Sequence, residues 1–424
     1  MIKTIVTDSL SREEIATSRT LPDVTAIVST ILNDVAKRGD TALYEYTERF
    51  DKCRLETLSV TRDEIEEAFA ETDPGFIEIL REAAENIRRF HASQIKSGYM
   101  LTSDNGVVTG QRVIPLERVG LYVPGGTAAY PSTVLMDAVP AKVAGCKEII
   151  VVTPPDQNGR IAPEILAAAA IAGVDKIFKI GGAQAVAALA YGTESVPGVD
   201  KICGPGNVFV AEAKRQVYGR VAIDMIAGPS EILIVSDGKS EAKNLAADLL
   251  SQAEHDRNAS AVLVTDCMEL AQQVSVELER QLALLPRAEI ARESINKNGL
   301  IVVTSDLNKA VAIANEIAPE HLELCVEDPF AWLGKIKHAG SVFLGRYCPE
   351  ALGDYFAGPN HTLPTSGTAR FSSPLSVDDF VKKSQYIYYT EDGLRNVYQK
   401  VAFFAEKEGL SAHGRSARIR FEEI

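Results

Sequence analysis

A glutamine and a histidine that could bind a metal ion stand where an expected helix meets an expected strand. Residues 241–250 have the spacing of a helix, and residues 259–265 form an apolar run typical of a buried strand. Gln252 and His255 lie between them, three residues apart, so a continued helix would put both on one face. A neutral imidazole beside an amide oxygen can form half of a metal site, although this spacing alone is more typical of a polar helix end facing water.

Acidic residues or loops rich in glycine and proline accompany four of the six histidines. Glu320 and His321 precede an apolar run at 322–326, which is expected to be a strand. Neighbouring side chains point to opposite faces of a straight strand, but before the strand is established both could reach one cleft as an acid/base pair. An exposed polar pair at the start of a strand would give the same pattern.

Two later segments offer further ligands for a cation. Asp354 and His361 flank a Gly-Pro pair that breaks any helix, so their side chains can converge on a loop. His413 follows Glu408 by five residues. Mixed nitrogen and oxygen ligands suit zinc or a similar divalent ion. Gln252, His255, Asp354 and His413 would together supply such ligands, although periodicity alone could not select residues so far apart in the sequence.

Four glycine-rich turns are expected to join strands to helices, at residues 124–127, 181–184, 204–207 and 227–230. In open parallel sheets such turns line the ligand crevice, where backbone N–H groups can approach phosphate. The chain has no G-x-G-x-x-G sequence, so the usual dinucleotide fingerprint is missing, and a single turn would be more typical of ordinary packing. Four turns with polar companions favour a cofactor and substrate cleft. These companions are Tyr122, Gln184, Asn207 and Ser230.

The elements that must position these residues alternate between strand and helix from residue 118 onward. The expected strands are 119–123, 148–152, 176–180, 201–202, 232–235, 261–265, 299–304 and 341–344. Such alternation predicts βαβ units with helices on both faces of a parallel sheet. Because so many strands would strain one sheet, we expect an α/β fold with two Rossmann-like parallel-sheet domains.

Both ends of the chain depart from this alternation. Residues 22 to about 97 have helical patterning, which includes a capping box at 61–64. Residues 345–390 are expected to be mainly loops, followed by a helix at roughly 391–408. The tail at 417–421 alternates like an edge strand.

The composition is that of an ordinary globular protein, and its charge limits the possible partners. A formal net charge of −14 opposes binding to nucleic acid or to an anionic membrane. The six scattered cysteines form no C-x-x-C pair and are expected to be reduced, and Cys146 and Cys203 are more typical of small buried residues than of nucleophiles. The N-terminus lacks the apolar core of a signal peptide, and the longest apolar run, 165–174, is too short to cross a bilayer. We therefore expect a cytoplasmic protein.

Taken together, nine segments in order along the chain resemble the histidinol dehydrogenase family, which carries out the last two steps of histidine biosynthesis. The matching segments are 120–126, 181–185, 204–207, 227–231, 251–256, 318–322, 353–354, 358–361 and 408–413. The first 110 residues match less distinctively. No departure from the family pattern occurs at the positions that carry its chemistry.

The resemblance implies a role for each of these positions. It places one zinc ion per subunit on Gln252, His255, Asp354 and His413, the acid/base pair on Glu320 and His321, and NAD contacts on Tyr122, Gln184 and Asn207. It places the substrate near Ser230, His361 and Glu408, together with the zinc ligands and the acid/base pair. It also implies a homodimer whose C-terminal arm reaches the partner's active site. The implied domains are a helical region at 1–110 packing on the first α/β domain, an α/β NAD-binding domain at 111–235, an α/β domain with the metal and acid/base residues at 236–380, and a C-terminal helix and arm at 381–424.

The implied reaction is the four-electron oxidation of L-histidinol through L-histidinal to L-histidine with two NAD. One alternative is a relative that oxidises another small amino alcohol or diol on the same frame. A second is a zinc hydrolase with Glu320 as base on a metal-bound water, which would leave the glycine-rich turns without a purpose. A third is a metal or nucleotide sensor without turnover, for which the chain offers no separate output domain.

Overall fold

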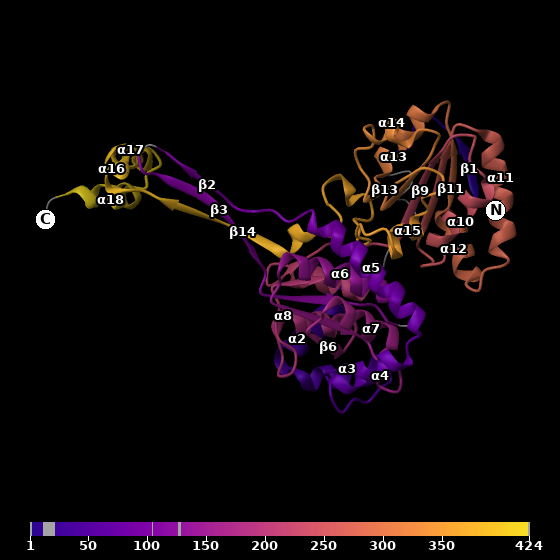
Figure 1. Cartoon of the computed structure of the whole chain (residues 1–424), viewed down its shortest axis with the longest axis horizontal. Helices are drawn as coiled ribbons and strands as arrows, with labels where there is room; N and C mark the ends of the chain where they lie inside the picture. Colours follow the sequence, from indigo (N-terminus) through magenta and orange to yellow (C-terminus); the bar gives the residue numbers. More distant parts are fainter. Residues whose placement is uncertain (1, 12–21, 104, 126–128, 423–424) are drawn as a thin grey trace. The chain divides into compact units, whose positions relative to one another are not determined.

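The computed structural model describes residues 2–11, 22–103, 105–125 and 129–422 (Figure 1). The chain divides into two compact units. Unit 1 comprises Met1–Gln94 and Leu116–Phe380, and unit 2 comprises Ile95–Pro115 and Val381–Ile424. Part of the first glycine-rich turn, including Gly126 and Thr127, lies outside the described residues.

The first sheet of unit 1 is parallel and has the strand order β6-β5-β4-β7-β8. Its strands are β4 (Arg118–Tyr122), β5 (Glu148–Thr153), β6 (Lys176–Lys179), β7 (Lys201–Cys203) and β8 (Ala222–Ile223). Helices alternate with them: α6 (Pro131–Ala144), α7 (Pro163–Ala172), α8 (Gly182–Tyr191) and α9 (Val208–Val217). Residues 149–152 of β5 are apolar and fully buried, as expected for a strand covered on both faces.

The N-terminal helices pack on both faces of this sheet (Figure 1). They are α2 (Thr25–Arg38), α3 (Asp40–Phe50), α4 (Arg62–Glu71) and α5 (Pro74–Ala92). Ile149 and Val151 share a core with residues of α4 and α5, whereas Ile150 and Val152 share the opposite core with residues of α2 and α3. The predicted capping box of Thr61 is present at the start of α4.

The second sheet of unit 1 is also parallel and has the strand order β1-β11-β10-β9-β12-β13. Its strands are β1 (Lys3–Val6), β9 (Glu231–Ser236), β10 (Ser260–Thr265), β11 (Leu300–Val303), β12 (His321–Cys325) and β13 (Ser341–Leu344). The helices are α10 (Ala242–Ala253), α11 (Met268–Leu282), α12 (Ala288–Asn298), α13 (Leu307–Ile317), α14 (Pro329–Leu333) and α15 (Glu350–Tyr355). Two parallel sheets flanked by helices confirm the predicted fold class.

Three local expectations for unit 1 were wrong. The start of the chain is not helical, because Lys3–Val6 pairs in parallel with β11 as the edge of the second sheet. The turn at 227–230 leads into strand β9 and not from a strand into a helix. Asp354 lies within helix α15 and not on a loop, because the Gly-Pro pair ends the helix only after it.

Unit 2 is built on an antiparallel sheet with the order β14-β3-β2 (Figure 1). Its strands are β2 (Tyr99–Thr102), β3 (Val108–Pro115) and β14 (Val381–Tyr388). The helices that follow are α16 (Glu391–Arg395), α17 (Tyr398–Lys407) and α18 (Ser411–Arg418). The region expected to be loop therefore contains a long strand, and the expected helix at 391–408 is two helices. The expected edge strand at 417–421 is wrong, since these residues end α18 and continue in the 3-10 helix η3 (Ile419–Phe421).

None of the helices formed by the described residues has the length and apolar character needed to cross a lipid bilayer.

Candidate active site

Strand β12 presents the predicted acid/base pair at its start, between strands β9 and β13. The backbone of Glu231 holds both side chains: its N–H donates to Glu320 Oε2 at 2.8 Å, and its carbonyl oxygen lies 3.0 Å from His321 Nδ1. Because a carbonyl can only accept, Nδ1 carries the proton, and Nε2 of a neutral His321 keeps its lone pair. The imidazole therefore has a fixed tautomer with its basic nitrogen free for chemistry.

Asp354 lies between two imidazoles. Its Oδ1 is 3.7 Å from His321 Nε2 and 3.8 Å from His361 Nδ1. The backbone carbonyl of Asp354 also lies 3.1 Å from His361 Nδ1. The sequence prediction that Asp354 and His361 converge is borne out by these distances, and His321 joins them.

These side chains line a small cavity of about 110 Å³. His321, Asp354 and His361 supply its polar lining, and Phe343 and Leu363 supply apolar walls. His321 Nε2 is buried and has no hydrogen-bond partner. An unpaired buried nitrogen costs free energy unless a ligand completes it, so this atom indicates a binding position.

The charges of this site depend on one another. Burial raises the pKa of the Glu320 carboxyl to about 8, only partly offset by His321. Burial opposes the charged form of His321, but the carboxylates of Glu320 and Asp354 outweigh it and raise the pKa of His321 to about 10. Carboxylates with shifted pKa values beside an imidazole are typical of catalytic sites.

Helix α10 ends beside this cluster. Gln252 lies in its last turn and is 1% exposed, with Nε2 donating to Glu350 Oε1 and with Oε1 lacking a partner. The helix stops at Ala253, so His255 lies in the following turn and does not share a helical face with Gln252. Burial lowers the pKa of His255, and the negative charge of Asp354 acts in the opposite direction.

The donors of unit 1 fit a divalent cation. Gln252 offers a buried amide oxygen without a partner, Asp354 a carboxylate, and His255 an imidazole that burial keeps neutral. Within the ranges that the structure describes, no three side chains of His, Cys, Asp or Glu gather as a cation site. Of the four predicted ligands, only His255 and Asp354 are residues of these types in unit 1. Gln252 is a glutamine, and His413 belongs to unit 2.

All three predicted NAD contacts lie at the carboxyl edge of the first sheet, and Asn207 is in the turn after β7. Tyr122 ends β4, and its hydroxyl oxygen accepts the N–H of Gly182 at 3.0 Å. Burial raises the pKa of Tyr122 to about 12, so the phenol stays protonated and can donate. Gln184, in the first turn of α8, is buried and its Oε1 has no partner. Both side chains therefore have unused polar capacity at a helix N-terminus, the place where dinucleotides bind in such sheets.

Asn207 and Ser230 each make hydrogen bonds that stabilise the nearby backbone. Asn207 is the N-cap of α9, with Oδ1 accepting the N–H groups of Phe209 at 3.0 Å and Val210 at 3.2 Å. Ser230 immediately precedes β9, and its carbonyl accepts the N–H of Ser260 at 2.9 Å. Neither contact uses the Ser230 hydroxyl or the Asn207 amide nitrogen.

Comparison with known proteins decides the family. The family model described as histidinol dehydrogenase matches residues 15–421. This chain belongs to the histidinol dehydrogenase family. The histidinol dehydrogenases of Clostridium acetobutylicum and Bacillus cereus are similar to it. The first is 55% identical over 400 residues, 94% of this chain and 93% of the relative, and the second is 57% identical over 396 residues, 93% and 92%.

A solved histidinol dehydrogenase has the same fold. The crystal structure from Elizabethkingia anophelis matches with a TM-score of 0.93 at 40% sequence identity. The match covers 99% of this chain and 98% of that one. The fold class predicted from strand and helix alternation is therefore that of a histidinol dehydrogenase.

Two residues predicted from the histidinol dehydrogenase pattern lie in unit 2. Glu408 is the C-cap of α17, and His413 lies in the first turn of α18. Both are exposed within the single chain. Their roles as substrate contact and zinc ligand stay predictions.

Sequence reasoning missed the residues that hold the His361 loop. Asn360 Nδ2 donates to the Met136 carbonyl of α6 at 2.5 Å, and Thr362 Oγ1 donates to Asp137 Oδ1 at 2.9 Å. Asp137 is fully buried, and its other oxygen has no partner. The one signal available was an aspartate inside an otherwise apolar helix, where an unpaired acid would be costly. Asn360 and Thr362 resembled ordinary loop residues.

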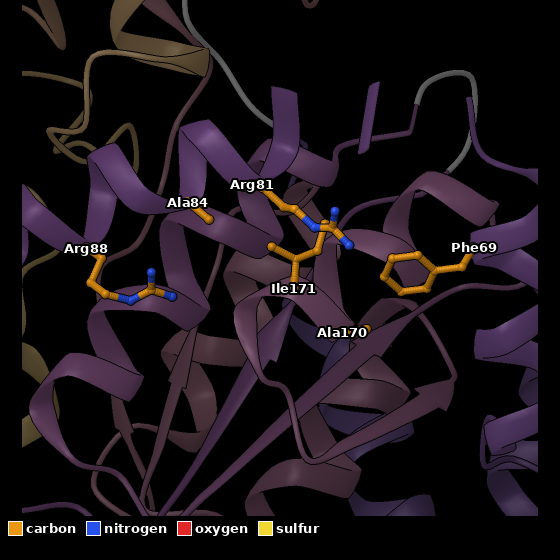
Figure 2. A pocket seen from close by; sticks show the side chains of 6 residues that line it. All are labelled: Phe69, Arg81, Ala84, Arg88, Ala170 and Ile171. Carbon is orange, nitrogen blue, oxygen red and sulfur yellow. The ribbon is translucent and has the colours of Figure 1, made fainter. Parts of the chain in front are cut away.

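A larger hollow of about 350 Å³ lies elsewhere in the chain, on helices α4, α5 and α7 (Figure 2). Its lining is Phe69, Arg81, Ala84, Arg88, Ala170 and Ile171. Arg81 pairs with Glu78 and Arg88 with Glu85, so glutamates on the same helix already balance both arginines. The hollow contains none of the predicted site residues.

Proposed function

We propose that this chain oxidises L-histidinol to L-histidine through bound L-histidinal, with the successive reduction of two NAD. The observation that carries the proposal is the environment of His321. The Glu231 carbonyl fixes its tautomer, while the unpartnered Nε2 faces Asp354 in a cavity shared with His361. A fixed imidazole with a free nitrogen suits a general base for alcohol oxidation.

In the first half of the reaction, His321 Nε2 accepts the hydroxyl proton of the alcohol as hydride leaves its carbon for NAD. In the second half, Glu320 takes a proton from the water that attacks the aldehyde, and His321 returns its proton to the aldehyde oxygen to give the hydrate. The hydrate then loses a hydride to NAD while its hydroxyl proton passes back to His321. Both residues are buried, which limits the access of competing nucleophiles from solvent to the bound aldehyde.

We assign the metal to Gln252, His255 and Asp354, with His413 as the fourth ligand. Zinc bound there would hold the substrate's imidazole and amine in place and act mainly by orientation. Its positive charge would also offset the Asp354 carboxylate, which together with Glu320 raises the pKa of His321, and would bring this imidazole towards the range where it can accept a proton.

The remaining residues bind the two reactants. Tyr122, Gln184 and Asn207 are proposed to contact NAD, and the unused polar atoms of Tyr122 and Gln184 support this. Ser230, His361 and Glu408 are proposed to contact histidinol along with the metal ligands.

We further propose a homodimer in which Glu408 and His413 complete the partner's site. The antiparallel sheet and helices of unit 2 expose many large apolar side chains, as expected of a surface that another chain covers. Among them are Met100 (63% exposed), Leu101 (61%), Ile387 (74%), Phe403 (60%) and Phe404 (66%). All six cysteines are unpaired, which supports a reducing compartment such as the cytoplasm.

The decisive variant is His321→Asn. We expect NADH formation from L-histidinol to fall by about 10²–10⁴-fold, the usual contribution of a general base, while bound zinc stays at the level of the unmodified protein. Turnover should be followed by absorbance and zinc by elemental analysis. His338→Asn serves as the control, because His338 lies outside the cavity lining and should keep full activity. Unchanged turnover in His321→Asn would contradict the assignment.

A further inference from the structure

The side chain of Gln252 has one satisfied end and one unsatisfied end. Its Nε2 donates to Glu350 Oε1, whereas Oε1 is buried without a hydrogen-bond partner. The residue is 1% exposed, so bulk water does not reach this oxygen. A buried amide oxygen left in this state indicates a position where a ligand completes it.

Glu350 is itself held firmly. It is 2% exposed, its backbone N–H donates to Glu323 Oε1 at 2.8 Å, and its second carboxylate oxygen accepts Ser251 Oγ at 3.1 Å. It is the first residue of α15, and Asp354 follows four residues later on the same short helix. Helix α15 therefore carries the proposed metal ligand Asp354 and, one turn earlier, Glu350, whose carboxylate contacts the second proposed ligand, Gln252.

The two ends of an amide differ in what they can bind. Only the oxygen can coordinate a cation, and the NH₂ group can only donate hydrogen bonds. A glutamine side chain without a partner could turn over and present its NH₂ group instead. A carboxylate that accepts from Nε2 excludes that orientation, because turning the amide would place two oxygens against each other.

We propose that Glu350 is a positioning residue that holds the Gln252 amide so that Oε1 faces the divalent cation. The inference rests on the proposed metal site and deepens it. Glu350 acts only through Gln252 and does not touch the metal. Partners of this kind typically change metal affinity by about 10–100-fold when removed.

The first test compares Zn²⁺ dissociation constants, measured by competition with a chromogenic chelator. Glu350→Leu removes the acceptor, and we expect Zn²⁺ binding to weaken by about 10–100-fold. Glu350→Gln keeps an oxygen that can accept from Nε2, so binding should stay within a few-fold of the unmodified protein. Ser251→Ala is the matched control, because it loses a contact to Glu350 but leaves the amide contact intact. Glu350→Ala replaces the leucine variant if that protein does not fold, as judged by melting of the metal-free form.

The second test separates positioning from general damage through a double-mutant cycle. In a Gln252→Ala background there is no amide to orient, so adding Glu350→Leu should change Zn²⁺ affinity little. The absorption spectrum of bound Co²⁺ should show the same pattern, with Glu350→Leu resembling Gln252→Ala and Glu350→Gln resembling the unmodified protein.

Two results would overturn the inference alone: equal Zn²⁺ affinity in Glu350→Leu and the unmodified protein, or an undiminished loss in the Gln252→Ala background. An unmodified protein that binds no divalent cation would overturn the proposed metal site and this inference with it. The affinity of the unmodified protein thus tests the function, and the differences between variants test the role of Glu350.

Discussion

At the scale of single residues, the chemistry depends on which atoms are left without partners. His321 Nε2 and Gln252 Oε1 are both buried and unsatisfied, although neighbouring groups fix the other end of each side chain. One end held and one end free is the arrangement that a preorganised site needs, because binding then costs no reorientation. The sequence predicted both residues, but it could not show which atom of each was free.

His255 should be needed for metal and activity together. Burial lowers its pKa and keeps the imidazole neutral, which is the form that coordinates zinc. We expect His255→Asn to lose bound zinc and histidinol oxidation in parallel, by at least about 10-fold each at limiting metal. Zinc content and initial rate should be measured on the same sample. Full activity in metal-depleted protein would contradict the assignment.

Sequence reasoning also missed Glu350. It follows a proline at the start of a helix, where an acid is common because its charge interacts favourably with the helix dipole. Only the tertiary contact with Gln252 shows its further role, and that contact joins residues 98 positions apart. Motif spacing along the chain carries no information about such a pair.

At the scale of elements, helix α6 holds the loop that carries His361. Asn360 and Thr362 both bind α6, so His361 lies between two anchored neighbours. The anchoring carboxyl of Asp137 sits beside the buried ion pair of Lys214 and Asp224. The strength of this connection should therefore depend on the protonation of Asp137.

Asp137 makes stability depend on pH. Burial, with Asp224 acting in the same direction, raises its pKa from 3.8 to about 8. Between these values the folded protein holds a proton that the unfolded chain releases, so stability falls as pH rises towards 8. In Asp137→Asn the amide oxygen can still accept from Thr362, but no proton titrates. We expect its melting temperature to decline less between pH 5.5 and 8, a difference of up to about 1.4 kcal/mol per pH unit in unfolding free energy. Parallel curves for the two proteins would contradict this.

The sequence predicted strands correctly where both of their faces are buried. Strands such as β5 and β10 are apolar throughout because helices cover both faces, and they were predicted within a residue or two. Strand β1 has mostly exposed residues at a sheet edge, and β14 contains two lysines and is exposed along much of its length. Neither has an apolar run to mark it, and both exist because of pairing with distant strands.

At the scale of the whole molecule, unit 1 contains most of the proposed site, and unit 2 contains Glu408 and His413. A chain that completes its partner's site would explain why α17 and α18 expose polar ligands next to a broad apolar surface. The sequence placed His413 in the ligand set through family resemblance, since no spacing rule links it to Gln252.

Shared sites predict activity in hybrids of two inactive variants. In a dimer of His321→Asn with His413→Asn, one site combines both defects and the other combines an intact unit 1 with an intact unit 2. Random pairing of the co-expressed chains should restore about a quarter of the unmodified activity. Each variant expressed alone provides the baseline. Activity no higher than that baseline, with hybrids verified by mass spectrometry, would mean that each chain completes its own site.

The most direct test of the proposed function is the number of NADH formed per molecule of limiting L-histidinol at saturating NAD. The proposal predicts two, because Glu320 and His321 together support both oxidations in one closed site. One NADH per histidinol would contradict the role of Glu320 in the second half. None, with zinc and NAD bound, would contradict histidinol as the substrate.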